Sequence, residues 1–164
     1  MEHYITCFLA LFFCISGCSR TPEELTGLSP VTITVVNGDT PIPGVRVLLN
    51  MEADSRIWSS TGVTNASGVA VISSTLRTHN KAGAKPGTYK VTLMQSITLP
   101  PELQPTEEET EAAIPNAPMQ AKRTEYFAKN RVVPQAFEDI TTTPIELTVI
   151  ENTPAALTVD VAKR

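Results

Sequence analysis

Histidine and cysteine are scarce in this chain of 164 residues, and only 5% of its residues are aromatic. The histidines are His3 and His79, and no cysteine follows Cys18. The chain beyond Cys18 therefore has no internal disulfide, and it lacks the two or more histidines or cysteines of a typical zinc or non-haem iron site. A nucleophilic triad needs a histidine oriented by a partner residue. We expect no catalytic site, no metal and no cofactor, so the protein is predicted not to be an enzyme.

An excess of basic residues is also absent, because 13 Lys and Arg stand against 17 Asp and Glu, for a formal charge of -4. A general nucleic-acid binder presents a basic face or stripe, so we expect no nucleic-acid partner. The hydrophobic content of 41% is too high for wholesale disorder. The length suits one domain with its own apolar core.

An apolar run without charge occupies residues 5–15, ITCFLALFFCI. It is shorter than the about 20 apolar residues of a membrane-spanning helix, but it has the length of a signal-peptide core. The run ends in the tetrapeptide ISGC at positions 15–18, an aliphatic residue and two small ones before a cysteine. This pattern resembles the lipobox of bacterial lipoproteins, so residues 1–17 are predicted to be a lipoprotein signal peptide. The alternative is a buried hydrophobic strand or helix.

The lipobox resemblance implies a location and an attachment. It implies cleavage before Cys18, diacylglycerol on the cysteine sulfur and a further acyl chain, such as palmitate, on the freed amine. Ser19, in place of the aspartate that retains lipoproteins in the inner membrane, favours the outer membrane. Residues 18–29, interrupted by Pro22 and Gly27, are predicted to form a flexible tether. We expect an exported protein that is lipid-anchored in the cell envelope, with its body in the periplasm or at the cell surface.

Short runs rich in Val, Ile and Thr, separated by Gly, Pro, Asn and Asp, dominate residues 30–164. The alternation of apolar and polar residues in these runs indicates strands with one buried face. No window predicts a long amphipathic helix. The predicted fold class is all-β, an antiparallel seven-stranded β-sandwich. The predicted strands are residues 31–36, 44–50, 57–63, 69–73, 88–95, 145–150 and 156–162.

Residues 100–131 interrupt the strand spacing and are predicted to form one long loop. Its first part is rich in proline and glutamate, whereas its last ten residues are basic and include Tyr126 and Phe127. Thr106 and Glu109 have the spacing of a capping box for a two-turn helix. Long loops in compact domains tend to be functional or disordered. Tyr126 and Phe127 have two interpretations: the basic part balances the glutamates and packs these aromatics inward, or the two residues form a contact surface for anionic lipid or cell-wall polymer.

Several short motifs carry a family resemblance. They are PGVRV at 43–47, TNASGVA at 64–70 and PGTYKV at 86–91. In this order they resemble the carboxypeptidase regulatory-like domain, a transthyretin-like (prealbumin-like) β-sandwich. The segments VPQAF at 133–137 and TPIELTV at 143–149 resemble the end of small lipoproteins with this domain, which are abundant in planctomycete-type bacteria. The resemblance covers residues 30–162 and implies a transthyretin-like fold, but it implies no activity, because one fold hosts many functions.

The remaining candidate residues have competing structural explanations. Trp58, the single tryptophan, is either a plug in the core or a platform on which a sugar stacks. His79 lies in a polar, basic loop, where we expect an exposed spectator. The glutamates at positions 107–111 lack the alternating acidic spacing of a calcium loop and are expected to stay solvated. Glu138 and Asp139 are sequence neighbours, whose side chains point apart on a strand and cannot act as a catalytic pair.

Taken together, these observations predict a lipid-anchored envelope protein whose non-catalytic β-sandwich is an interaction or structural module. The alternative is a carbohydrate- or protein-binding module that uses Trp58 or the 100–131 loop; a hydrolase is a further alternative. The expected partners are the membrane, through the lipid on Cys18, and an envelope protein or polysaccharide.

Overall fold

The computed structural model describes residues 25–51, 59–77, 79–105 and 117–163. Cys18, Trp58, the glutamates at 107–111 and the expected helix at Thr106 lie outside the described residues, as do the predicted signal peptide and the first part of the tether.

The first of two sheets is built around β1, which lies between strands from distant parts of the chain. On one side β1 pairs with β10, and the two strands run parallel. On the other side β1 pairs antiparallel with β2 and with β5. The strands of this sheet are β1 (Val31–Asn37), β2 (Thr40–Pro41), β5 (Val69–Val71) and β10 (Ala155–Asp160).

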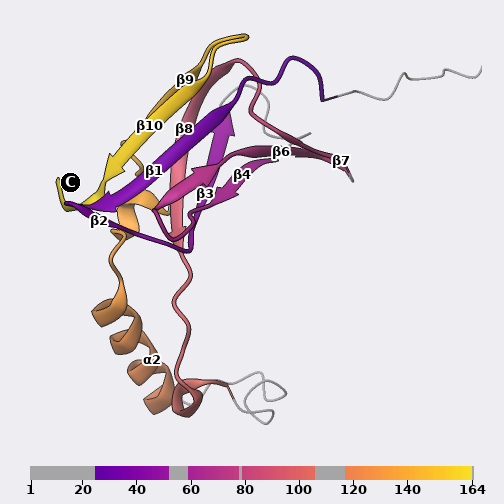
Figure 1. The fold of residues 1–164 in the computed structure, drawn as a ribbon. Helices are drawn as coiled ribbons and strands as arrows, with labels where there is room; N and C mark the ends of the chain where they lie inside the picture. The colour runs from indigo at the N-terminus through magenta and orange to yellow at the C-terminus, as the bar shows by residue number, and fades with distance from the viewer. Residues whose placement is uncertain (1–24, 52–58, 78, 106–116, 164) are drawn as a thin grey trace, which may run out of the picture.

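The second sheet has six strands in the order β7-β6-β4-β3-β8-β9, and every neighbouring pair is antiparallel. Figure 1 shows β1 and β10 lying across this sheet, so that the molecule is a two-layered sandwich. The strands are β3 (Val45–Met51), β4 (Ser59–Val63), β6 (Ser73–Leu76), β7 (His79–Ala82), β8 (Gly87–Gln95) and β9 (Glu146–Val149).

The core fills the space between the two sheets, because alternate side chains of each long strand point inward. Every second residue of β1 from Val31 to Val35 is buried. The expected shared faces on β3 and β8 are confirmed by burial: alternate residues face the core in both strands. Val133 and Phe137 join the same core from the segment that precedes β9, where the 3-10 helix η2 (Gln135–Phe137) lies.

The predicted fold class is confirmed, with two differences in detail. The described residues form ten strands rather than seven, since β2 and β7 are added and the expected strand 69–73 is divided between β5 and β6. One pair, β1 with β10, is parallel rather than antiparallel. The chain crosses from one sheet to the other between β4 and β5, at the turn that ends at Gly68, whose N–H donates to Asn65 O at 2.9 Å.

The prediction that no long helix occurs is wrong. Within residues 100–131 the structure contains the 3-10 helix η1 (Pro101–Leu103) and the 14-residue helix α2 (Ala117–Asn130). Met, Gln, Ala, Lys, Arg and Glu fill most of α2, and these residues favour helix. Pro118 stands in its first turn, where a missing backbone N–H costs nothing. A third 3-10 turn, η3 (Val161–Lys163), replaces the end of the last predicted strand.

Tyr89 shows how the sandwich accommodates a buried aromatic residue with a polar hydroxyl. The ring is buried, and the hydroxyl donates to Lys85 O at 2.7 Å, so the polar end of the side chain has a partner. Burial raises the pKa of Tyr89 to about 12. Folded protein therefore keeps a proton that unfolded protein, with an ordinary tyrosine pKa of about 10, releases.

We expect the stability of the protein to respond to alkali through Tyr89. The stabilisation is fully present below about pH 10 and is lost as the pH rises through the pKa of about 12 in the folded state. Denaturant unfolding should be measured below and above about pH 10. As the pH rises, the unfolding free energy of the native chain should fall more than that of Tyr89→Phe. Equal losses for the two proteins would contradict this assignment.

Candidate functional site

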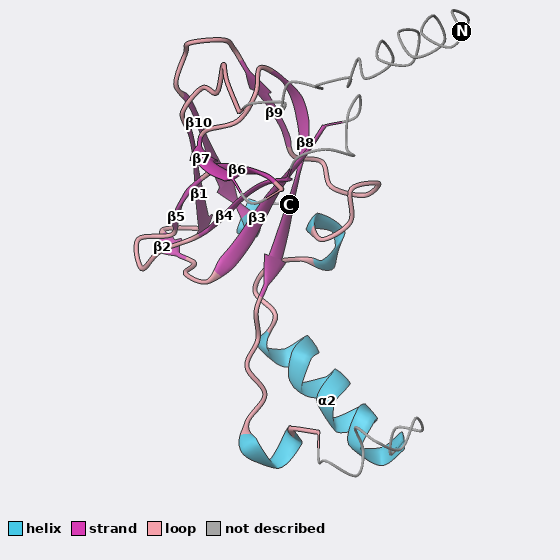
Figure 2. Ribbon diagram, turned by 90° about the vertical axis from the view of Figure 1, so that its right-hand side faces the viewer, coloured by secondary structure: helices cyan, strands magenta, loops and turns pink. Residues whose placement is uncertain are grey.

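The main feature outside the sandwich is a projecting segment between β8 and β9, residues 96–131, which we call the arm. Its described parts contain η1 and α2. Figures 1 and 2 show the arm extending from the end of the sandwich where β8 ends, and Figure 1 shows β1 beginning at the opposite end. The arm therefore points away from the end of the sandwich at which β1 begins.

A groove lies between the two described halves of the arm. Pro100 and Leu103 form one wall, and Met119 and Tyr126 on α2 contribute to the other. Its volume of about 410 Å³ falls in the range of about 300–1,000 Å³ that is usual for ligand pockets. Lys122, Glu125 and Lys129 line the same groove, so an apolar stripe runs beside alternating charges.

No described residue of the arm is buried. Met119, Tyr126 and Phe127 are half-buried, and η1 is the element that packs against α2. The Arg123 Nε group crosses between the halves and donates to Leu103 O at 2.7 Å. The described part of the arm therefore offers little packing that would hold α2 in place. This matters because an isolated helix of about 12–15 residues is only marginally stable in water.

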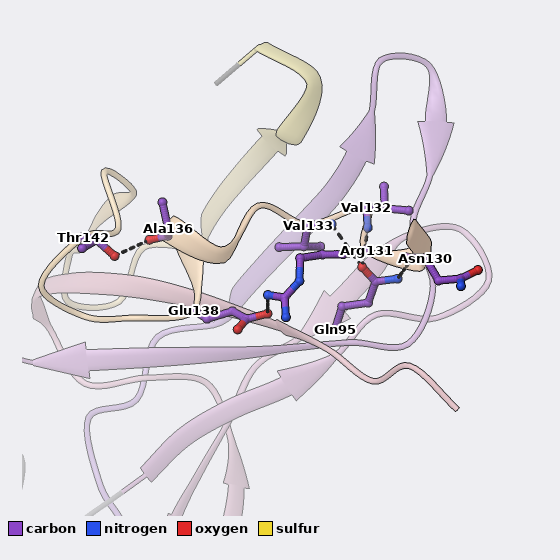
Figure 3. Close-up of polar contacts among 8 residues, drawn as sticks. All are labelled: Gln95, Asn130, Arg131, Val132, Val133, Ala136, Glu138 and Thr142. Carbon is purple, nitrogen blue, oxygen red and sulfur yellow. Dashed lines mark hydrogen bonds and ion pairs between the residues drawn. The ribbon is translucent and has the colours of Figure 1, made fainter. Parts of the chain in front are cut away.

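The root of the arm, in contrast, is firmly tied to the sandwich through Gln95, the last residue of β8 (Figure 3). Its Oε1 accepts hydrogen bonds from the N–H groups of Val132 at 2.8 Å and Val133 at 3.1 Å. Its Nε2 donates to Asn130 O at 3.4 Å. One side chain thus joins the end of β8, where the chain enters the arm, to residues 130–133, where the chain returns to the sandwich.

The segment that returns from the arm is fixed by further polar contacts. Arg131 forms an ion pair with Glu138 at 2.5 Å, and Thr142 Oγ1 donates to Ala136 O at 2.7 Å (Figure 3). Asp139 accepts from the hydroxyl and the N–H of Thr141, and these hydrogen bonds hold the pKa of Asp139 below its usual value. The segment that returns from the arm is therefore held by several polar contacts within it.

We expect Gln95→Ala to loosen the arm without unfolding the sandwich. The variant loses the acceptor for two backbone N–H groups, so the unfolding free energy should fall by about 1 kcal/mol. Amide hydrogen exchange at Val132 and Val133 should become faster. The control is Gln104→Ala, which removes a bond from Gln104 Nε2 to Leu99 O within the arm. Unchanged exchange at Val132 and Val133 in Gln95→Ala would show that the root does not depend on this residue.

Comparisons with known proteins add little to this geometry. No protein-family model matches the chain, and no curated protein is significantly similar to it. A solved structure that does match is the crystal structure of a variant of BcpA, the major pilin subunit of Bacillus cereus, with a TM-score of 0.41 and 12% sequence identity. The match covers 81% of this chain and 29% of that chain. At this level of similarity the pilin gives no information about function.

The sequence-predicted residues are distributed unevenly over the structure. Tyr126 and Phe127 both lie on α2, and Tyr126 lines the groove. His79 is exposed on the edge strand β7.

Among the described residues no three His, Cys, Asp or Glu side chains gather closely enough to hold a metal ion. Within the same part of the chain, no helix has the length and apolar character needed to cross a membrane.

Sequence reasoning missed three residues of this site: Leu103, Met119 and Gln95. Met119 and Tyr126 are seven positions apart, which places them on one face of a helix, but this spacing is informative only once the helix is known. Leu103 and Gln95 contact residues 20 and 35 to 38 positions away, which no local pattern predicts.

Proposed function

We propose that this protein is a lipid-anchored interaction module of the bacterial cell envelope. A lipid on Cys18 holds it in the outer membrane, the β-sandwich acts as a rigid spacer, and the arm contacts an envelope partner. The lipobox-like ISGC at positions 15–18 supports the anchor.

The observation that carries the interaction role is the exposed state of the arm. Its described residues include a 14-residue helix and an apolar groove, yet none of them is buried. Single exposed apolar residues are normal on a protein surface, whereas a grouped apolar surface that the protein itself does not cover marks an interaction site. The firm root formed by Gln95 supports the same role, because a rigid base lowers the entropy lost when the arm binds.

Replacement of the arm tests this proposal. Gln95 reaches Asn130, so the two ends of the arm are close together, and residues 97–129 can be exchanged for a short Gly-Asn-Gly linker. We expect this variant to keep the thermal stability of the sandwich and to lose the cross-links to envelope components that the native chain forms in cells. The control is Ile150→Ser, which changes an exposed apolar residue in the turn between β9 and β10. Undiminished cross-linking of the arm-less chain would refute the role of the arm.

A further inference from the structure

We propose that a cavity on the sandwich binds a primary ammonium group carried on an apolar stem, as in a free alkylamine or a lysine side chain. The cavity lies on the outer face of the six-stranded sheet, between β3 and β8 on one side and residues 135–140 on the other. This inference goes beyond the proposed function, because it assigns a ligand site that needs neither the lipid anchor nor the arm.

The cavity has the size of a ligand site and an apolar wall. Its volume of about 550 Å³ falls within the range of about 300–1,000 Å³ that is usual for ligand pockets. Leu48 and Met94 from the sheet and Ile140 from the returning segment form the apolar wall. Met94 and Ile140 are 46% and 44% exposed. An alkyl stem lying against these two side chains would therefore remove apolar surface from water, which favours binding.

Thr92 and Asn50 give the cavity a polar floor with unused hydrogen-bonding capacity. Thr92 lines the cavity and is only 4% exposed. Its hydroxyl accepts a hydrogen bond from Asn50 Nδ2 at 3.2 Å and makes no other within the described part of the chain, although a hydroxyl has two lone pairs and a proton. Asn50 Oδ1 likewise has no partner among the described residues. Because buried polar groups are normally paired, this floor favours a ligand that supplies N–H donors.

Glu138 and Asp139 bring two carboxylates to the same cavity. Their expected divergence applies to a strand, but these residues follow η2, and Glu138 has a helical backbone with φ -81 and ψ -24. Glu138 pairs with Arg131 (Figure 3), whereas Asp139 has no ion-pair partner within the described residues. Among those residues no basic side chain lines the cavity. The lining is therefore negatively charged and favours a cation.

The combination of these walls identifies the class of ligand. An inorganic cation would make no use of the apolar wall, and an anion would be repelled by the two carboxylates. An ammonium group on a stem of a few methylenes matches both parts, since its three N–H groups are donors only and its stem is apolar.

Titration of the full chain with n-butylammonium chloride at constant ionic strength tests the site. We expect the NMR signal of the Met94 methyl group to move with a dissociation constant on the order of millimolar, while that of Met119 on α2 stays in place. Methylammonium, which lacks the stem, should bind about tenfold more weakly. 1-Butanol, which lacks the charge, should bind about fivefold more weakly. Equal binding of methylammonium would indicate an adventitious ion only, and equal binding of 1-butanol a merely apolar surface; either result overturns the proposal.

Asp139→Asn tests the role of the carboxylate. Asparagine keeps an oxygen that accepts from the N–H and the hydroxyl of Thr141, so the local turn is preserved. The variant should bind butylammonium about fivefold more weakly. Glu151→Gln, which neutralises an exposed carboxylate in the turn between β9 and β10, is the matched control and should bind as the native chain does. Unchanged affinity in Asp139→Asn would overturn the proposal.

A further probe, N-acetyl-lysine methylamide, distinguishes the two sources of the ammonium group. If it binds more tightly than butylammonium, the site takes a lysine side chain of a protein; if it binds more weakly, the site takes a free amine. The chain in which residues 97–129 are replaced should bind butylammonium as the native chain does, even if its envelope cross-links persist and the proposed role of the arm is wrong. No movement of the Met94 signal at butylammonium concentrations up to about 100 mM would overturn the ligand site and leave the proposed function untouched.

Discussion

Replacing Cys18 by alanine is expected to move the protein from the membrane fraction to the soluble fraction, or to leave it unprocessed with residues 1–17 attached. Each buried methylene of an acyl chain contributes about 0.8 kcal/mol to membrane binding, so two or three acyl chains hold a protein firmly in a membrane. Without the thiol no lipid is attached. Fractionation of cells and the intact mass of the purified chain measure both effects.

Cys14→Ala is the matched control for this experiment. Cys14 lies four positions earlier, within the apolar run, and is not at the predicted cleavage site. We expect the control to remain in the membrane fraction with the added mass of the lipid. A native chain whose mass shows an intact leader, or an unmodified thiol, would contradict the proposed anchoring while leaving the fold and the arm unaffected.

Gly68→Ala is expected to reduce the unfolding free energy by about 3 kcal/mol. Gly68 has φ +71, in the left-handed region, and a Cβ atom there would lie 2.6 Å from Val35 O. The left-handed conformation costs a non-glycine residue about 1–2 kcal/mol, and the collision with a backbone atom adds to it. Moreover, Gly68 O accepts the N–H of Val35 at 2.8 Å, so relief of the collision disturbs the contact between this turn and β1. Denaturant unfolding measures the loss.

Gly44→Ala separates the two contributions. Gly44 has a similar φ of +73, but no atom lies within 4 Å of the added Cβ. We therefore expect this control to lose only the conformational part, about 1–2 kcal/mol. Equal losses in the two variants would mean that the space around Gly68 adjusts without cost.

The long strands could be predicted because they bury one face. In β1, β3 and β8 apolar residues recur at every second position, and the predicted limits of these strands differ from the observed ones by a single residue at each end at most. β7 could not be predicted in this way. All four of its residues, from His79 to Ala82, are exposed, so it is held by backbone hydrogen bonds to β6 and its side chains carry no alternating signal.

Local sequence patterns also could not predict which strands lie side by side, or whether two neighbouring strands run parallel or antiparallel. Alternation tells which face of a strand is buried but not which strand lies beside it, and this is why the parallel pairing of β1 with β10 was not foreseen. The arm was missed for a related reason. The prolines and glutamates that precede α2 dominate the composition of the segment, and the apolar face of the helix itself is narrow.

For the candidate site, the sequence indicated Tyr126 and Phe127 as a contact surface, and the structure shows that both belong to one helix beside a groove. The sequence could not indicate the groove, because the second wall of the groove comes from Leu103, on the other side of the arm from α2. The predicted roles of Cys18 and Trp58 stay predictions, because these residues lie outside the described part of the chain.

The parallel pairing of β1 with β10 has a consequence for how the chain matures. Gly38, just after β1, donates to Asp160 Oδ1, 122 positions further along the chain. The first sheet therefore cannot be completed before β10 has been synthesised, and contacts between such distant segments form slowly. Until β10 joins β1, the first sheet lacks one of its strands and β1 keeps an unpaired edge.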